Sequence, residues 1–155
     1  MAAKKWAFED FVEGGTIELG TKLVSADEII EFASEFDPQP MHLNEEAGKA
    51  SILGGLSASG WHTCAMFMRL LCDGYLLDST SQGSPGIDYM KWKKPVLAGD
   101  RLSARSTIVA KRVSKSRPSV GLVTMRAEMF NQHGESVLEF ENTGMFLTRG
   151  AENAA

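Results

Sequence analysis

The sequence predicts an α+β fold in which an antiparallel sheet wraps around one long buried helix. Residues 60–77 are apolar on nearly every helical face, which is typical of a helix inside a protein. Four segments with period-two alternation follow that helix, and one precedes it. A chain of 155 residues is long enough for one domain with a proper core, and we expect a single domain over 1–155 with its core at about 10–148.

The first half alternates between short elements and turns. Residues 16–24 alternate loosely and predict a strand. Ser25 and Glu28 form a capping box, and the stripe of apolar residues after it predicts a helix that ends at Pro38. Residues 44–50 predict one or two helical turns capped by Asn44, and a loop of small residues then leads into the central helix.

The second half is strand-like. A turn with glycine in the left-handed position is expected at residues 131–135. The strands are expected at residues 87–96, 101–110, 123–129 and 138–146. A frayed tail is expected over 149–155. Such a sheet leaves edges open, and pairing edge to edge between two subunits would cover them.

The charges exclude a general nucleic-acid binder, because the net charge is −4 and such proteins need a basic face. Residues 1–60 hold 4 Lys and Arg against 11 Asp and Glu, whereas residues 91–117 hold 9 basic residues and one acid. Two interpretations of the basic stretch stay open. It could meet a phosphorylated ligand, or it could be two solvated edge strands whose lysines prevent aggregation.

The remaining composition points to a cytoplasmic protein. Cys64 and Cys72 lie eight residues apart on one helix, about 12 Å of rise, so no disulfide can join them and free thiols are expected. Residues 1–13 lack the apolar core of a signal peptide. Arg69 and Asp73 interrupt the longest apolar run, which excludes a membrane span.

The strongest chemical signal is an acid and an imidazole on a stiff connector. Asp37 and His42 are five residues apart, and Pro38 and Pro40 restrict the backbone between them. A carboxylate can orient or deprotonate a water, and a histidine titrates near neutrality and can pass the proton. Each residue alone is commonly structural, but their combination beside a loop of small residues predicts addition or removal of water.

Gly60 is the second candidate, because it opens the central helix where backbone N–H groups lack partners. A thioester oxygen that gains negative charge could rest there. No metal site is expected, since the three histidines are scattered and no ligand spacing is present. Ser57 lacks the pattern of a hydrolase nucleophile, and His62 in the first turn of the helix is expected to be structural.

With these residues in place, the chain resembles the MaoC-like dehydratases, relatives of the (R)-specific enoyl-CoA hydratases that have a hotdog fold. The resemblance covers roughly residues 10–148. Phe36-Asp37-Pro38-Gln39-Pro40-Met41-His42 matches the family's Gly-Asp-x-Asn-Pro-Leu-His in the aspartate, the second proline and the histidine. Ser59-Gly60 stands where the family has His-Gly, and the segment at 93–100 resembles the strand and turn that follow the family's central helix.

The resemblance implies a hydro-lyase that hydrates a trans-2-enoyl thioester or dehydrates a 3-hydroxyacyl thioester. It implies that Asp37 and His42 act on a water, and that Gly60 donates its N–H to the thioester oxygen. Gln39 keeps the amide of the family's asparagine on a longer side chain. Phe36 and Ser59 replace the usual glycine and histidine, and both are expected to reshape the pocket.

The resemblance also implies the partners. The expected substrate is an acyl-CoA or an acyl-carrier thioester, with coenzyme A as part of the substrate and no separate cofactor, and the basic stretch becomes a candidate contact for its phosphates. A homodimer, or a higher oligomer built from dimers, is expected. Two alternatives remain: a hotdog thioesterase that directs water at the thioester carbon, and a catalytically silent domain for acyl-CoA binding or subunit assembly.

Overall fold

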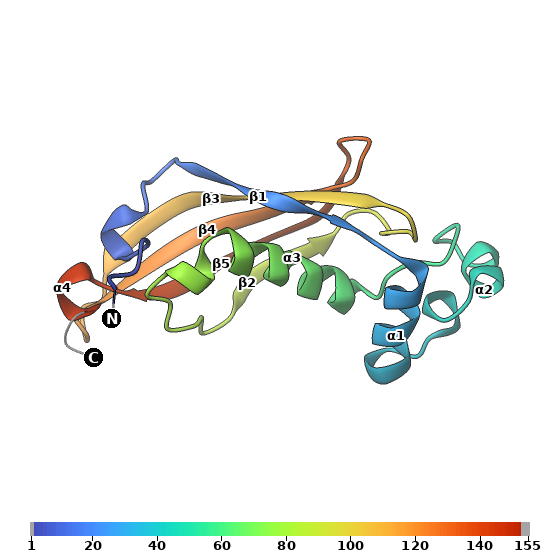
Figure 1. Ribbon diagram of the computed structural model, residues 1–155, viewed down its shortest axis with the longest axis horizontal. Coiled ribbons are helices and arrows are strands. Elements are labelled where there is room, and N and C mark those ends of the chain that lie inside the picture. Colours follow the sequence, from blue (N-terminus) through green and yellow to red (C-terminus); the bar gives the residue numbers. More distant parts are fainter. Residues whose placement is uncertain (1, 153–155) are drawn as a thin grey trace.

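A five-stranded antiparallel sheet forms one layer of the protein, and helix α3 runs along one of its faces (Figure 1). The computed structural model describes residues 2–152. The strand order in the sheet is β1-β3-β4-β5-β2, so β1 and β2 are the edges. The strands are β1 (Thr16–Leu23), β2 (Ile87–Trp92), β3 (Arg101–Val113), β4 (Val120–Phe130) and β5 (Ser136–Leu147). One strand before the central helix and four after it confirm the predicted α+β class.

Helices α1 and α2 begin directly after the capping residues predicted from the sequence. The helical segments are η1 (Phe8–Asp10), α1 (Ala26–Phe36), η2 (Pro40–His42), α2 (Glu45–Ala50), α3 (Gly60–Gly74), η3 (Leu76–Asp78) and α4 (Arg149–Glu152). Ser25 caps α1 by accepting the N–H of Glu28, and Asn44 caps α2 by accepting the N–H of Ala47. Residues 149–152 of the expected frayed tail form helix α4. The last residues of that tail, 153–155, lie outside the described part of the chain. Among the described residues, no helix is long and apolar enough to cross a membrane.

Helix α3 is buried on one face only, which corrects the expectation that it is buried all round. The face toward the sheet carries Met66, Phe67, Leu70 and Leu71. On the other side, Trp61 is 61% exposed and Met68 is 47% exposed, because the sheet can cover only one face of the helix. A row of apolar side chains therefore remains open along the outer face of α3.

Strand β2 ends at Trp92 rather than at the expected residue 96, and the reason bears on the site. After Lys93 donates to the carbonyl of Val137, the chain leaves β5 and pairs with the loop that precedes α3. Ala58 donates to the carbonyl of Val96 at 2.8 Å, and Ala98 donates to the carbonyl of Leu56 at 3.0 Å. This second pairing fixes the small-residue loop that opens α3.

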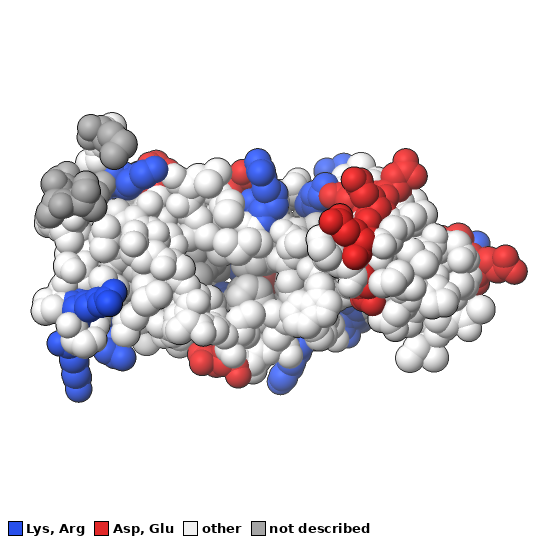
Figure 2. Space-filling view, turned by 90° about the horizontal axis from the view of Figure 1, so that it is seen from below, with Lys and Arg blue, Asp and Glu red and all other residues white. Residues whose placement is uncertain are grey.

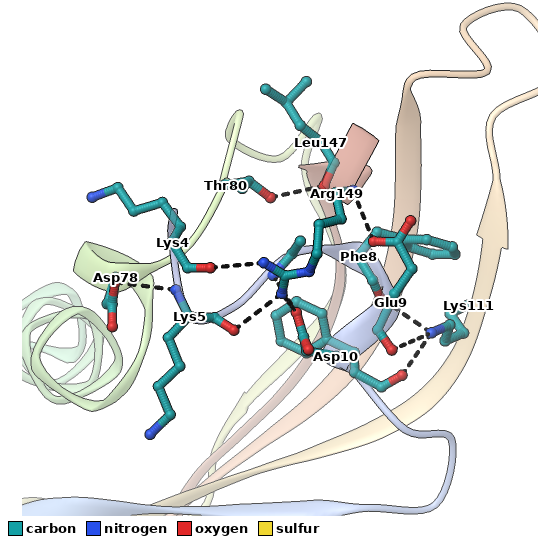
Figure 3. Close-up of polar contacts among 12 residues, drawn as sticks. Lys4, Lys5, Phe8, Glu9, Asp10, Asp78, Thr80, Lys111, Leu147 and Arg149 are labelled. Atoms are coloured by element: carbon teal, nitrogen blue, oxygen red, sulfur yellow. Dashed lines mark hydrogen bonds and ion pairs between the residues drawn. The ribbon is translucent and has the colours of Figure 1, made fainter. Parts of the chain in front are cut away.

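The two termini are held together at the end of the sheet farthest from α1 and α2 (Figure 1). The guanidinium of Arg149 donates to the carbonyls of Lys4 and Lys5 and pairs with Asp10 (Figure 3). The ammonium of Lys111 on β3 donates to the carbonyl of Phe11 at 2.7 Å. These contacts fasten the N-terminal segment across β3 and the end of β5.

Candidate active site

The connector between α1 and α2 brings the predicted acid and imidazole together. Asp37 ends α1, and its N–H still donates to the carbonyl of Ala33 at 2.9 Å. The chain then turns through Pro38, and η2 carries His42 back toward the start of α3. As a result, Nε2 of His42 lies 3.6 Å from Oδ2 of Asp37. The predicted proximity of the two side chains is present in the structure.

Both oxygens of the Asp37 carboxylate accept hydrogen bonds. Ser59 Oγ donates to Oδ2 at 2.7 Å, and Gln39 Nε2 donates to Oδ1 at 2.7 Å. These two donors, Ser59 first, together with nearby His42, lower the pKa of Asp37 below its ordinary value of 3.8 although desolvation opposes the shift. Asp37 is therefore held as a carboxylate, an acceptor of protons, at neutral pH.

The orientation of His42 is fixed by a backbone carbonyl. His42 is buried, and its Nδ1 lies 2.7 Å from the carbonyl oxygen of Ser57. A carbonyl can only accept, so Nδ1 must carry the proton in that contact. In its neutral form the imidazole then presents an unprotonated Nε2 to Asp37. With the imidazole neutral, the pair thus consists of two proton acceptors, Nε2 and Oδ2, that lie 3.6 Å apart.

The start of α3 completes the site. Ser59 caps the helix by accepting the N–H of Trp61 at 3.3 Å, so this one hydroxyl joins the helix to Asp37. The N–H of Gly60 makes no hydrogen bond within the described residues, as expected for the first residue of a helix. Gly60 lines the same cleft as Asp37 and His42, and the cleft has a volume of about 370 Å³. An unpaired N–H at this place is available to a developing oxyanion.

Trp92 explains why residue 60 is glycine in this chain. Its Nε1 donates to the carbonyl of Gly60 at 3.0 Å. A Cβ on residue 60 would lie 2.6 Å from Cε2 of the indole, closer than side chains tolerate. The missing side chain at residue 60 therefore admits the indole of Trp92 against the opening turn of α3.

The basic stretch identified in the sequence is divided between the two ends of the sheet. Lys93 and Lys94 line the cleft, where Lys93 pairs with Glu139 at 3.0 Å and Lys94 pairs with Glu135. Lys111, by contrast, holds the N-terminal segment at the other end of the sheet through its hydrogen bond to the carbonyl of Phe11. The interpretation as two edge strands is wrong for β3, which lies between β1 and β4, and right for β2. Only the first part of the stretch is close enough to meet a ligand in the cleft.

The structure revises the expectations for the departures from the family pattern. Gln39 and Ser59 hold the carboxylate, as described above. Phe36 does not line the cleft; it is 65% exposed and lines a separate groove between α1 and α3. The expectation that Phe36 reshapes the pocket is therefore wrong, because its side chain lines the groove between α1 and α3 instead.

Sequence reasoning missed two contributors, the carbonyl of Ser57 and the indole of Trp92. Ser57 was considered only as a nucleophile, and its contribution comes from its backbone. For Trp92 the sequence carries only a weak signal, since it is a large aromatic residue directly before two lysines at the end of β2.

Comparisons with known proteins agree with this architecture. The family profile described as "MaoC like domain" matches residues 11–129. A solved structure described as a MaoC-like dehydratase from Rhodospirillum rubrum is 38% identical, with a TM-score of 0.82 over 92% of this chain and 97% of that chain. The uncharacterised protein YdeM of Bacillus subtilis is 31% identical over 86% of this chain and 93% of its own length.

A shorter similarity covers the mesaconyl-CoA hydratase of Haloarcula hispanica. It is 37% identical over 65 residues, which are 41% of this chain and 18% of that protein. The fold is also similar to that of RV0216 from Mycobacterium tuberculosis, described as a double hotdog fold, with 17% identity and a TM-score of 0.77 over 92% of this chain and 44% of that chain, so the predicted hotdog fold is confirmed.

Proposed function

The chain belongs to the MaoC-like family, and from this premise we propose that it is a hydro-lyase acting on acyl thioesters. The proposed reaction is the reversible addition of water to a trans-2-enoyl thioester, which gives a 3-hydroxyacyl thioester. One observation supports the proposal: Nε2 of His42 and Oδ2 of Asp37 lie 3.6 Å apart in a cleft that Gly60 also lines, and the N–H of Gly60 has no partner among the described residues.

In the proposed mechanism a water donates one hydrogen bond to Oδ2 of Asp37 and the other to Nε2 of His42. Its oxygen then points a lone pair at C3 of the enoyl group. As the C–O bond forms, one proton of the water passes to the pair, and negative charge moves to the thioester oxygen beside the Gly60 N–H. The pair then returns that proton to C2 as the enolate collapses, so that the hydroxyl on C3 and the hydrogen on C2 together account for one water and the pair regains its starting state. The two groups titrate as a coupled pair, so the proton is assigned to the pair as a unit.

We further propose coenzyme A as the carrier of the acyl group. Lys93 and Lys94 lie at the cleft, and an ammonium has three N–H donors, so each can bind a phosphate and still keep its glutamate. The proposal places the acyl end of the substrate toward Asp37 and Gly60 and the phosphates toward these lysines.

We also propose a homodimer. The outer edge of β2 pairs with no other strand among the described residues, and Ile87 and Trp92 on this strand are each about half exposed. An open edge with apolar side chains favours a second copy that pairs edge to edge along β2. Light scattering should give a particle with about twice the 16.9 kDa mass of the chain, and a monomer at micromolar concentration would refute the dimer.

The test of the reaction is hydration of crotonyl-CoA, followed by loss of the enoyl absorbance with a parallel measurement of free thiol. Asp37→Asn and His42→Ala should each lower kcat by about 10²–10⁴-fold, the usual size of acid–base assistance. Asp88→Asn and His133→Ala, at residues that do not line the cleft, are the matched controls and should keep full activity. Release of thiol without loss of the double bond would identify a thioesterase instead. Binding without any turnover, equal in parent and variants, would identify a silent binding domain.

A further inference from the structure

A second cavity of about 500 Å³ lies beside the cleft, between the outer face of α3 and strands β2 and β5. Its lining includes Phe67, Met68, Leu71, Met90 and Phe140. None of its described lining residues is charged, and its few polar side chains include Ser84, which donates to the carbonyl of Thr143 at 2.7 Å. Seen from the α3 side, the middle of the molecule is hollowed and its centre is mostly uncharged, with charged side chains at the upper and lower edges, while acids gather at the end that holds α1 (Figure 2). A cavity of this composition accepts hydrocarbon and repels phosphate.

Trp61 is the one described residue that lines both this apolar cavity and the cleft. Its ring meets the ring of Trp92 edge to face, with centroids 5.3 Å apart and planes at 83°. Trp92 is held in turn by its hydrogen bond to the carbonyl of Gly60. The two indoles therefore stand between the place proposed for the thioester and the apolar cavity.

The two tryptophans differ in how tightly their rings are held. Trp92 is tied to Gly60 and packs against it. The indole of Trp61 is 61% exposed, and no hydrogen bond from its ring nitrogen occurs among the described residues. Of the pair, Trp61 is the ring that a substrate or a substitution can displace without breaking α3.

We propose that the Trp61–Trp92 pair sets the acyl-chain length, as a wall between the cleft and the apolar cavity. This inference rests on the proposed function, because it takes the lysines as the phosphate end and Gly60 as the thioester end of the substrate. The acyl chain then points at the two indoles. A short acyl chain ends before them, and a longer chain must displace Trp61 to enter the cavity. The intact protein therefore prefers short acyl groups.

The test compares kcat/KM for crotonyl-CoA and trans-2-decenoyl-CoA in the parent, Trp61→Ala and Trp61→Phe. Removal of the indole should raise the decenoyl-to-crotonyl ratio by about tenfold or more, since hydrophobic pockets discriminate about 10-fold or more for each methylene that they accept or refuse. Trp61→Phe should fall between the parent and Trp61→Ala. Thermal unfolding of each variant shows that the fold is kept, as expected for a half-exposed side chain. An unchanged ratio in a folded Trp61→Ala protein overturns the proposal.

Met68→Ala supplies the matched control, because Met68 lines the apolar cavity but not the cleft. With the wall intact, this variant should keep the parental ratio, since no acyl chain reaches Met68. In the Trp61→Ala background the same change should alter the decenoyl rate and leave the crotonyl rate alone. A large effect of Met68→Ala in the parental background would mean that long chains enter past an intact Trp61, which also overturns the wall.

Failure of the wall and failure of the hydratase proposal can be told apart. Calorimetric binding of butyryl-CoA and decanoyl-CoA measures chain selectivity without turnover. If the parent hydrates no enoyl-CoA but Trp61→Ala still shifts binding toward decanoyl-CoA by tenfold, the reaction is wrong and the wall is right. If crotonyl-CoA is hydrated and neither the rate ratio nor the binding ratio moves, the wall is wrong and the reaction stands.

Discussion

Nε2 of His42 lies 3.6 Å from Oδ2 of Asp37, and with the imidazole in its neutral form neither atom carries a proton. The carbonyl of Ser57 takes the one N–H of the neutral imidazole, and the lowered pKa of Asp37 keeps its carboxylate ionised. Two acceptors this close together can bind a molecule that has two hydrogen-bond donors, such as water. The geometry of the pair therefore favours chemistry on water over a direct Asp–His relay of the kind that activates a side-chain nucleophile.

Ser59→Ala should reduce kcat by about tenfold or more, because it removes the hydroxyl that holds Oδ2 of Asp37 in place, and small misplacements of a catalytic group are costly. It also removes the cap of α3, which should cost about 0.5–2 kcal/mol of stability. Ser25→Ala separates the two effects, since it deletes a comparable cap on α1 that has no contact with the site. Steady-state rates with crotonyl-CoA and urea unfolding measure both quantities. Equal activity in the two variants would show that the Ser59–Asp37 contact is dispensable.

Gly60→Ala should lower activity and stability together. Its N–H remains, but the new Cβ would lie 2.6 Å from Cε2 of Trp92, so the indole or the start of α3 must move. Trp92→Leu in the same protein should restore part of the stability, because it removes the ring that the Cβ meets. Gly86→Ala is the control, since a Cβ there meets nothing within 4 Å. Near-parental melting and rates for Gly60→Ala would contradict the close packing described here.

Much of the fold could be predicted from local patterns. The strands β3, β4 and β5 follow from period-two alternation, and α1 and α2 follow from their capping residues, since these signals act over a few residues. Strand β2 was predicted too long because the partner of residues 96–98 is the loop at 56–58, a pairing that no local pattern reveals. The open outer face of α3 was missed for a similar reason, as apolar side chains do not tell which of them a sheet will cover.

The site was predictable in its two central residues and not in their surroundings. Asp37 and His42 share a connector of six residues, so proximity in sequence implies proximity in space. The surrounding contacts join residues that are distant in the sequence. Ser59 lies 22 residues from Asp37, and Trp92 lies 32 residues from Gly60. Ser57 acts through its carbonyl, which every residue possesses, so its role carries no sequence signal.

Lys93→Ala and Lys94→Ala should raise KM for crotonyl-CoA several-fold with little change in kcat, because these ammonium groups line the cleft but take no part in the proposed proton transfer. The effect should weaken as salt is added, since surface charge interactions are screened. Crotonyl-pantetheine, which lacks the nucleotide phosphates, should show no difference between parent and variants. Lys115→Ala, outside the lining of the cleft, should behave as the parent. An equal rise in KM for both thioesters would mean that the lysines act on the shape of the cleft rather than on phosphate.

His62 should make the protein less stable as pH falls from 7 toward 5. Its ring is buried, stacked on Phe32 at 4.8 Å, and its Nδ1 has no hydrogen-bond partner among the described residues. Burial lowers the pKa of His62 below the ordinary value of 6.5, although Glu28, whose Oε1 lies 4.0 Å from Nε2, opposes the shift.

The direction of the effect follows from which state binds the proton. Below pH 6.5 the unfolded chain protonates this imidazole while the folded protein does not, so the free energy of unfolding falls until the pH passes the lowered pKa. His62→Phe keeps a ring against Phe32 and removes the titration, so its unfolding free energy should change less between pH 7 and 5. His133→Ala, in the exposed turn after β4, controls for loss of an imidazole elsewhere. Urea unfolding at several pH values measures the slopes. Parallel slopes for the parent and His62→Phe would mean that the folded protein accepts the proton, with Glu28 outweighing burial.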